Sequence, residues 1–192
     1  MTPGIAEVET GSGVLLDDGT LLARAGDGDG SAFEQLVIRY RPPMYRLAFR
    51  MLSHSGDAED AVQDVFVAAW RRLADLRADT AFVGWLYRIT TNRCLNVLRC
   101  RRPTAELDPD AATTVHMAHQ PERAAEVNEE LAALDDALGM LTPSQRACWL
   151  LREGHGRSYD EIADIVGTST TAVRGRIARA RTQLAEVMRP WQ

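Results

Sequence analysis

Apolar residues between positions 18 and 102 recur every three or four residues, the spacing that places them on one face of an α-helix. We expect four helices there, which begin near Asp18, Ser31, Asp57 and Ala81. Ser31 with Glu34 has the spacing of a capping box for the second helix. Pro42 and Pro43 should kink or interrupt that helix, and Pro103 should end the fourth.

A second group of helical repeats follows residue 123. Four helices are expected over residues 124–139, 143–153, 158–166 and 170–189. Thr142 before Pro143 has the pattern of an N-cap followed by an N1 proline, and Ser158 with Glu161 that of a capping box. Gly167 should end the third of these helices and leave a short turn before the last one. A short helix, a glycine-containing turn and a basic helix are typical of a helix-turn-helix.

Residues 103–123 separate the two groups, because they carry Pro, Asp, Ala and Thr without a helical period. We expect an acidic flexible linker there and a disordered tail over residues 1–17, which are rich in Gly, Thr and Glu. The expected fold is therefore all-α. It has two small helical domains, residues 18–102 and 124–192, joined by the linker.

The distribution of charge says more than the net charge of −5. All 22 basic residues are arginines, and five lie within residues 81–102 and four within 165–185, with no acid in either stretch. Acidic residues gather instead within 57–64, on the polar side of the third helix. Two basic clusters on an acidic chain indicate that nucleic acid is bound at two places.

The last helix has the pattern expected of a recognition helix. Val173, Ile177, Ala180 and Leu184 form its apolar stripe, which leaves its arginines for solvent or DNA. Such a helix presents its N-terminal residues to base edges, and arginine pairs with guanine through two hydrogen bonds.

The fourth helix combines aromatic and basic residues, with Trp85 and Tyr87 close to Arg88 and Arg93. Aromatic rings stack on unpaired bases while arginines hold phosphates, so this helix suits separated DNA strands. A core position for Trp85 is an equal alternative.

These motifs resemble extracytoplasmic-function (ECF) sigma factors. The segments 141–146, 158–167 and 172–181 resemble their region 4, with departures from the usual wording at Thr142, Ala172, Arg174 and Gly175. The segment 57–70 resembles region 2.2, and the segment 82–102 resembles regions 2.3 and 2.4.

The resemblance implies a protein that binds core RNA polymerase, at the β′ clamp helices and the β flap, and directs it to promoter DNA. It also implies an anti-sigma factor, a cytoplasmic location without membrane insertion, no cofactor and no enzymatic activity. Core polymerase is expected to contact Asp60, Gln63, Asp64 and Phe66. The −10 element is expected to contact Trp85, Arg88, Asn92, Arg93 and Arg99, and the loop 74–80 to form a pocket for a flipped base. The −35 element is expected to contact Ser169, Thr170, Thr171, Arg174, Arg176, Arg179 and Arg181.

Two other classes of protein fit parts of the sequence. A stand-alone helix-turn-helix regulator of the LuxR type would share the C-terminal motif, but it would not need the acidic third helix or the aromatic–basic fourth helix. A helical metal-dependent enzyme would have to use the four histidines, His54, His116, His119 and His155. Neither these nor the three cysteines, Cys94, Cys100 and Cys148, have the spacing of a zinc site. No apolar run approaches the ~20 residues of a membrane span.

Overall fold

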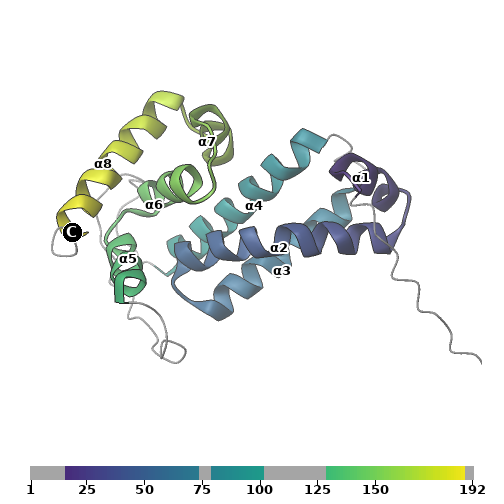
Figure 1. The fold of residues 1–192 in the computed structure, drawn as a ribbon, viewed down its shortest axis with the longest axis horizontal. Coiled ribbons are helices and arrows are strands. Elements are labelled where there is room, and N and C mark those ends of the chain that lie inside the picture. The colour runs from purple at the N-terminus through teal and green to yellow at the C-terminus, as the bar shows by residue number, and fades with distance from the viewer. Residues whose placement is uncertain (1–15, 74–78, 102–128, 189–192) are drawn as a thin grey trace, which may run out of the picture.

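The computed structural model describes residues 16–73, 79–101 and 129–188, and these residues are folded as helices without strands (Figure 1). The N-terminal helices are α1 (Asp18–Gly26), α2 (Gly30–Leu52), α3 (Ser55–Arg72) and α4 (Asp79–Cys100). The C-terminal helices are α5 (Glu129–Gly139), α6 (Pro143–Trp149), η2 (Leu150–Gly154), α7 (Tyr159–Val166) and α8 (Thr170–Met188). The all-α fold is confirmed. Residues 1–15 of the expected tail (1–17) and the expected linker (103–123) lie outside the described residues.

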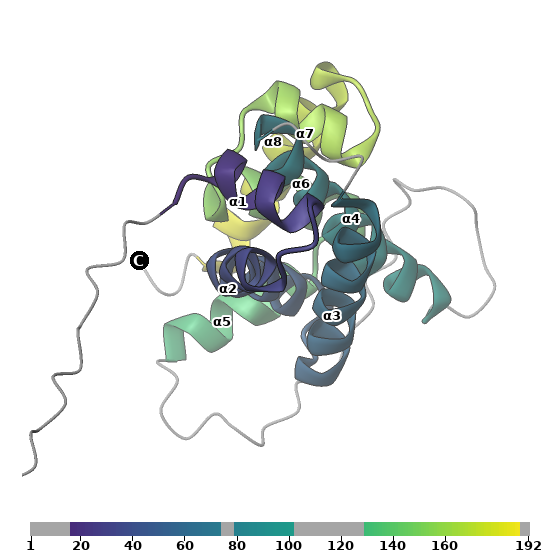
Figure 2. The same ribbon diagram turned by 90° about the vertical axis from the view of Figure 1, so that its right-hand side faces the viewer.

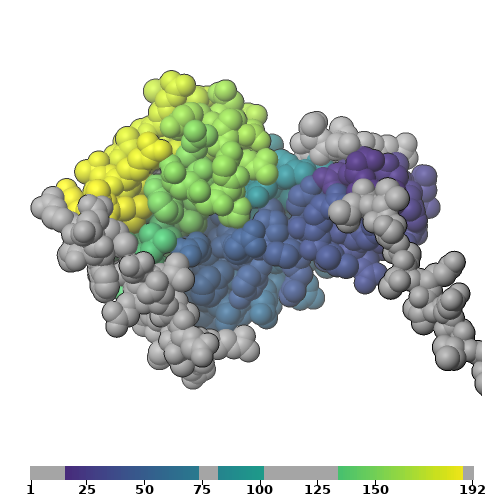
Figure 3. Space-filling view, in the orientation of Figure 1, coloured from purple at the N-terminus to yellow at the C-terminus, as the bar shows by residue number. Residues whose placement is uncertain are grey.

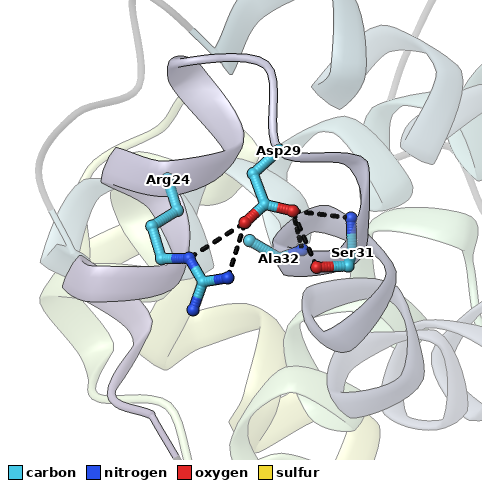
Figure 4. Close-up of polar contacts among 4 residues, drawn as sticks. All are labelled: Arg24, Asp29, Ser31 and Ala32. Carbon is cyan, nitrogen blue, oxygen red and sulfur yellow. Dashed lines mark hydrogen bonds and ion pairs between the residues drawn. The ribbon is translucent and has the colours of Figure 1, made fainter.

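The cap of α2 is Asp29 rather than the predicted Ser31 (Figure 4). One carboxylate oxygen of Asp29 accepts hydrogen bonds from the backbone N–H groups of Ser31 and Ala32, at 3.0 and 3.2 Å. The other oxygen accepts from Arg24 of α1, at 2.6 Å. The Ser31 hydroxyl also donates to the first oxygen, at 2.7 Å. This bond, together with those from Arg24 and the Ala32 N–H, lowers the pKa of Asp29 to about 2. Asp29 therefore begins α2 and also fixes its turn with α1, which a hydroxyl at position 31 could not do.

Two other caps also lie upstream of their predicted positions. Asp17 rather than Asp18 caps α1. His54 rather than Asp57 caps α3, since its Nδ1 accepts from the backbone N–H of Asp57 at 3.1 Å. Asp57 lies inside the first turn, where its carboxylate pairs with Arg101 of the segment after α4.

Of the two effects expected of the prolines, a kink or an interruption, the interruption does not occur, because α2 runs from Gly30 to Leu52 with Pro42 and Pro43 inside it. Its core face continues on both sides of them, with Leu36, Met44 and Leu47 fully buried. Burial of a leucine side chain contributes about 1.5–3 kcal/mol, so packing on both sides outweighs the local cost of a proline.

The first four helices share one core. Their largest fully buried side chains are Leu21, Leu22, Leu36, Met44, Leu47, Met51, Leu52, Phe82 and Leu86. The helical period of the α3 sequence predicts an apolar stripe of Ala58, Ala61, Val62, Val65, Phe66, Ala69, Trp70 and Leu73. This stripe is buried in the core, with the exception of Trp70, which is 46% exposed.

The C-terminal helices follow the predicted caps closely. Both capping boxes form, Thr142 with Gln145 and Ser158 with Glu161. Gly167 ends α7 in the left-handed conformation, at φ 67°. The predicted helix 143–153 is different, because α6 ends at Trp149 and continues as one π-helical turn.

The helix-turn-helix is held by the predicted stripe of α8. Val173, Ile177, Ala180 and Leu184 are all buried, and α8 packs on α6 and α7.

The two groups of helices pack directly on each other. Helix α7 lies against α4, while α6 and η2 contact α2. Figures 1 and 2 show the C-terminal helices seated along one side of the α2–α4 layer, and Figure 3 shows their surfaces in continuous contact.

We predict that Gly167→Ala lowers the free energy of unfolding by about 1–2 kcal/mol, because an L side chain is strained at this positive φ. No atom lies within 4 Å of the added Cβ, so strain alone is measured. Gly175→Ala, inside α8, is the control and should stabilise the protein by about 1 kcal/mol. Urea unfolding of the three proteins tests this, and equal stabilities would contradict the assigned turn.

Candidate nucleic-acid and protein interfaces

The outward face of α3 is acidic at one end and apolar at the other. At 3.6 residues per turn, Asp60, Gln63, Val67 and Trp70 follow one another on the side opposite the core. Asp60, Gln63 and Asp64 are exposed, as predicted, and Val67 and Trp70 are 44% and 46% exposed.

Phe66, which was expected to contact core polymerase, is only 7% exposed and packs in the core. The helical period explains this correction, since Phe66 lies one residue before Val67 and about 100° around the helix from it. The exposed large apolar side chains of α3 are therefore Val67 and Trp70. The sequence predicts no interface for either of them.

Neighbouring helices flank this outward face on both sides. The rings of Trp70 and Phe33 of α2 lie 5.0 Å apart between centroids, tilted by 57°. On the other side the carboxylate of Asp64 pairs with Arg93 of α4 at 2.5 Å. Arg93 therefore joins α4 to the acidic end of α3.

Helix α4 carries most of the predicted −10 residues on one face. Trp85, Arg88, Asn92 and Arg99 have the spacing of a single helical stripe. Arg88, Asn92 and Arg99 are exposed and Trp85 is half-buried. Asn96 lies on the same stripe, where its side-chain oxygen accepts a hydrogen bond from Arg99 at 2.9 Å.

Tyr87 does not belong to this stripe. It is 4% exposed, and its hydroxyl lies 3.1 Å from Nδ1 of His155. The guanidinium of Arg157 lies over its ring, 4.3 Å from the centroid. Tyr87 is therefore not available to stack on a base in this structure, contrary to the expectation.

His155 is held in its neutral form. Burial, together with the positive charges of Arg46 and Arg157, lowers the pKa of His155 to about 4. The neutral ring suits a place beside Tyr87 and near two guanidinium groups, because a third positive charge there would be repelled.

The start of α8 is held by hydroxyl groups. The Ser169 hydroxyl accepts from the backbone N–H of Ala172 at 3.2 Å, so it caps the helix. The Thr170 hydroxyl donates to Asp160 of α7 at 2.9 Å. Thr171 is exposed in the first turn.

The four predicted arginines of α8 lie on two flanks of its outward side. Arg174 and Arg181 lie on the flank toward η2 and α7, and Arg176 and Arg179 on the other. Arg174 lies over the ring of Tyr159, 5.4 Å from its centroid. Arg181 pairs with Glu153 at 2.6 Å. The exposed surface between the flanks carries Thr171 and Ala178.

The remaining sequence expectations concern metal, thiols and membranes. No three His, Cys, Asp or Glu side chains gather as metal ligands within residues 16–73, 79–101 and 129–188. His116, His119 and residues 74–78 of the expected base pocket lie outside these ranges. Cys94 and Cys148 are buried, Cys100 is exposed, and no disulfide joins them. None of the helices in the described part combines the length and apolar character of a membrane span.

An exposed basic helix-turn-helix beside a second aromatic–basic helix places the chain in the class of helix-turn-helix DNA-binding proteins. Comparison with known proteins shows which family of DNA-binding proteins the chain belongs to. Residues 36–104 match the family Sigma-70 region 2, and residues 131–184 match Sigma-70, region 4.

Relatives match over almost the whole chain. The RNA polymerase sigma-H factor of Pseudomonas aeruginosa is 34% identical over 187 residues, which cover 90% of this chain and 94% of the relative. The ECF RNA polymerase sigma-E factor of Escherichia coli K12 is 34% identical over 184 residues, covering 91% and 96%. The solved structure of CnrH in complex with the cytosolic domain of CnrY superposes with a TM-score of 0.69 at 34% identity, covering 90% and 97%.

The chain therefore belongs to the sigma-70 family of RNA polymerase sigma factors, in its ECF group. It directs transcription initiation by RNA polymerase at promoters and is not an enzyme. The presence of region 2 as well as region 4 excludes the stand-alone regulator.

Proposed function

We propose that three outward faces of this sigma factor divide the work of initiation. The outward face of α3 docks on core polymerase, that of α4 binds the −10 element, and that of α8 binds the −35 element. The observation that carries this division is that each predicted set falls largely on one exposed helix side, while the opposite side is buried in a core.

If α3 docks on core polymerase, the polymerase surface that it contacts should be basic and partly apolar. Asp60, Gln63 and Asp64 favour a basic helix, and we assign this helix to the β′ clamp. Val67 and Trp70 add an apolar contact one to two turns further along, and Phe33 holds the Trp70 ring in place. Because aromatic anchors dominate most interfaces, Trp70 should contribute more than any single acid.

We predict that Asp60→Arg and Trp70→Ala each weaken binding to core polymerase. Reversal of an interfacial charge costs several kcal/mol, and loss of a buried aromatic anchor costs about 2 kcal/mol or more. Asp60 is preferred to Asp64, since reversal of Asp64 also breaks its pair with Arg93. Affinity is measured without DNA on variants whose circular dichroism is unchanged.

Glu186→Arg makes the same charge change on the exposed end of α8 and is the matched control. It should leave the affinity for core polymerase unchanged. Wild-type affinity in both α3 variants would remove the docking assignment.

At the −10 element, Trp85 offers a half-buried ring for an unpaired base, and Arg88, Asn92 and Arg99 provide donors for phosphates and base edges. Arg93 contributes once Asp64 is engaged by the polymerase.

At the −35 element, the first turns of α8 enter the major groove, where Thr171 and Arg174 meet base edges. Ser169 and Thr170 shape the helix start, while Arg176, Arg179 and Arg181 hold phosphates along the two flanks. Glu153 neutralises part of the charge of Arg181 in the free protein.

We predict that Arg174→Ala and Arg181→Ala differ in kind. Loss of a base contact should cost about 1–3 kcal/mol and relax the preference at one or two base pairs. Loss of a phosphate contact should weaken binding evenly and lower the salt slope by about 1. Holoenzymes are measured against all single-base variants of the −35 element.

Glu153→Gln frees Arg181 and should strengthen binding evenly, the opposite of Arg181→Ala. If Arg174→Ala lowers every affinity equally while Arg181→Ala changes the preferred sequence, α8 faces the groove the other way.

Further parts of the proposal concern organisation and partners. We divide the chain into a tail (1–17), region 2 (18–102), a linker (103–123) and region 4 (124–192). We place the protein in the cytoplasm, where RNA polymerase acts, with the β flap as a second contact on the polymerase. We also propose an anti-sigma factor, supported by the structures of CnrH with CnrY and, at 24% identity, of RpoE with the anti-sigma factor NepR from Bartonella quintana.

A further inference from the structure

The first turn of α7 packs against the flank of α8 that carries two of the predicted −35 arginines. The capping box of Ser158 and Glu161 begins α7 directly before Tyr159 and fixes the backbone there. Tyr159 is half-buried and packs against the core. Next to it, the Asp160 carboxylate accepts a hydrogen bond from the Thr170 hydroxyl at the start of α8, at 2.9 Å. The first turn of α7 is therefore fixed relative to α8.

Two guanidinium groups lie over the ring of Tyr159. The guanidinium carbon of Arg152 in η2 lies 4.7 Å from the ring centroid, and that of Arg174 in α8 lies 5.4 Å from it. Arg152 also donates a hydrogen bond to the backbone carbonyl of Arg157 at 2.9 Å, just before the start of α7. Arg152 therefore helps to hold the ring from the side of η2, and the ring offers Arg174 a fixed surface.

The hydroxyl of Tyr159 lies close to the next arginine on the same flank. Arg181 follows Arg174 by about two turns of α8. Its pair with Glu153 raises the pKa of Arg181, and a hydrogen bond with Tyr159 makes a smaller contribution in the same direction. One tyrosine therefore contacts both arginines on this flank of α8.

Contact with an aromatic ring leaves the hydrogen-bond donors of an arginine available. The guanidinium is planar, and its N–H groups point outward within that plane, whereas a ring contacts its face. Arg174 can therefore stay over Tyr159 while two of its donors meet the acceptors of a guanine in the major groove. A carboxylate would occupy these donors instead, as Glu153 does at Arg181.

The ring also restricts where the donors of Arg174 can lie. A free arginine side chain samples many rotamers, and ordering it on binding costs conformational entropy. A side chain that is already held over a ring loses less entropy, and only base pairs within reach of that position benefit. The effect of Tyr159 should therefore appear in sequence preference rather than in general affinity for DNA.

We propose that Tyr159 is a positioning residue for recognition of the −35 element, because its ring holds Arg174 in place for the base pair that this arginine reads. Tyr159 acts through Arg174 and does not read the base itself. The inference rests on the proposed role of Arg174 and adds to it a residue of α7 that determines specificity.

The contact is measured first in the free protein, by nuclear magnetic resonance of the Arg174 side chain. The ring current of an aromatic side chain shifts the signals of protons above its face upfield. This shift should be present in the wild type and in Tyr159→Phe, which retains the ring, and absent in Tyr159→Leu. Unshifted Arg174 signals in the wild type would overturn the positioning role, whatever Arg174 does on DNA.

The effect on specificity is measured with holoenzymes on all single-base variants of the −35 element. Tyr159→Leu should lower the preference at the base pair that Arg174 reads by about two- to fivefold, as expected for loss of an exposed cation–π contact. Tyr159→Phe should retain the preference. In the Arg174→Ala background, Tyr159→Leu should change the preference no further, because the two residues act as one unit.

Tyr45→Leu makes the same change at a half-buried tyrosine of α2 and is the matched control, which should keep the wild-type −35 preference. Equal loss of preference in Tyr159→Phe and Tyr159→Leu would overturn the role of the ring. Even weakening on all sequences by Tyr159→Leu, with and without Arg174, would show a phosphate contact and overturn the positioning role.

Failure of this inference and failure of the proposed function give different patterns. A preference that is lost in Arg174→Ala but kept in Tyr159→Leu would contradict the positioning role alone. A preference that is kept in Arg174→Ala would contradict the base contact of Arg174, and with it the inference that depends on that contact.

Discussion

The structure depends on how α4 divides its residues among three sides. Phe82 and Leu86 enter the core shared with α1, α2 and α3, where both are fully buried. Tyr87 turns toward region 4, and Trp85 with Arg88 and the residues one and two turns beyond face outward. The period of the helix ties these sides together, since a change of register would move every residue to another surface. One helix therefore sets the region 2 core, the contact with region 4 and the face that we propose for the −10 element.

The same helix connects surfaces that the proposed function keeps separate. Arg93 links the −10 helix to the acidic end of α3 through Asp64. Both side chains are about half exposed, at 48% and 56%, and such a pair contributes only about 0–1 kcal/mol. Its role is therefore to orient Arg93 rather than to stabilise the fold. A weak pair also exchanges easily when another charged partner arrives, as the proposed docking of α3 on the polymerase requires.

Local patterns predicted most of the fold, and the errors have specific physical causes. The stripes of α3 and α8, both C-terminal capping boxes and the turn at Gly167 follow from residues close in sequence. The predicted caps of α2 and α3 were wrong because the capping side chains, Asp29 and His54, lie two and three positions upstream of Ser31 and Asp57. Tyr87 contacts His155, 68 residues away, and Arg146 donates to the carbonyl of Met51, 95 residues away. No pattern of neighbouring residues could have predicted these contacts. The helical spacing of Trp70 with the apolar residues of α3 predicted that it is buried. It lies instead at the edge of the buried stripe, and its side chain is 46% exposed.

The central claim is that this chain directs core polymerase to promoters by reading two elements at once. Runoff transcription by the reconstituted holoenzyme on a genomic promoter library tests it most directly. We expect transcripts from a defined set of start sites that share both a −10 and a −35 sequence, and only when the chain and core polymerase are both present. Transcription without a shared −10 sequence, together with tight footprints of the free chain on duplex DNA at physiological salt, would contradict it.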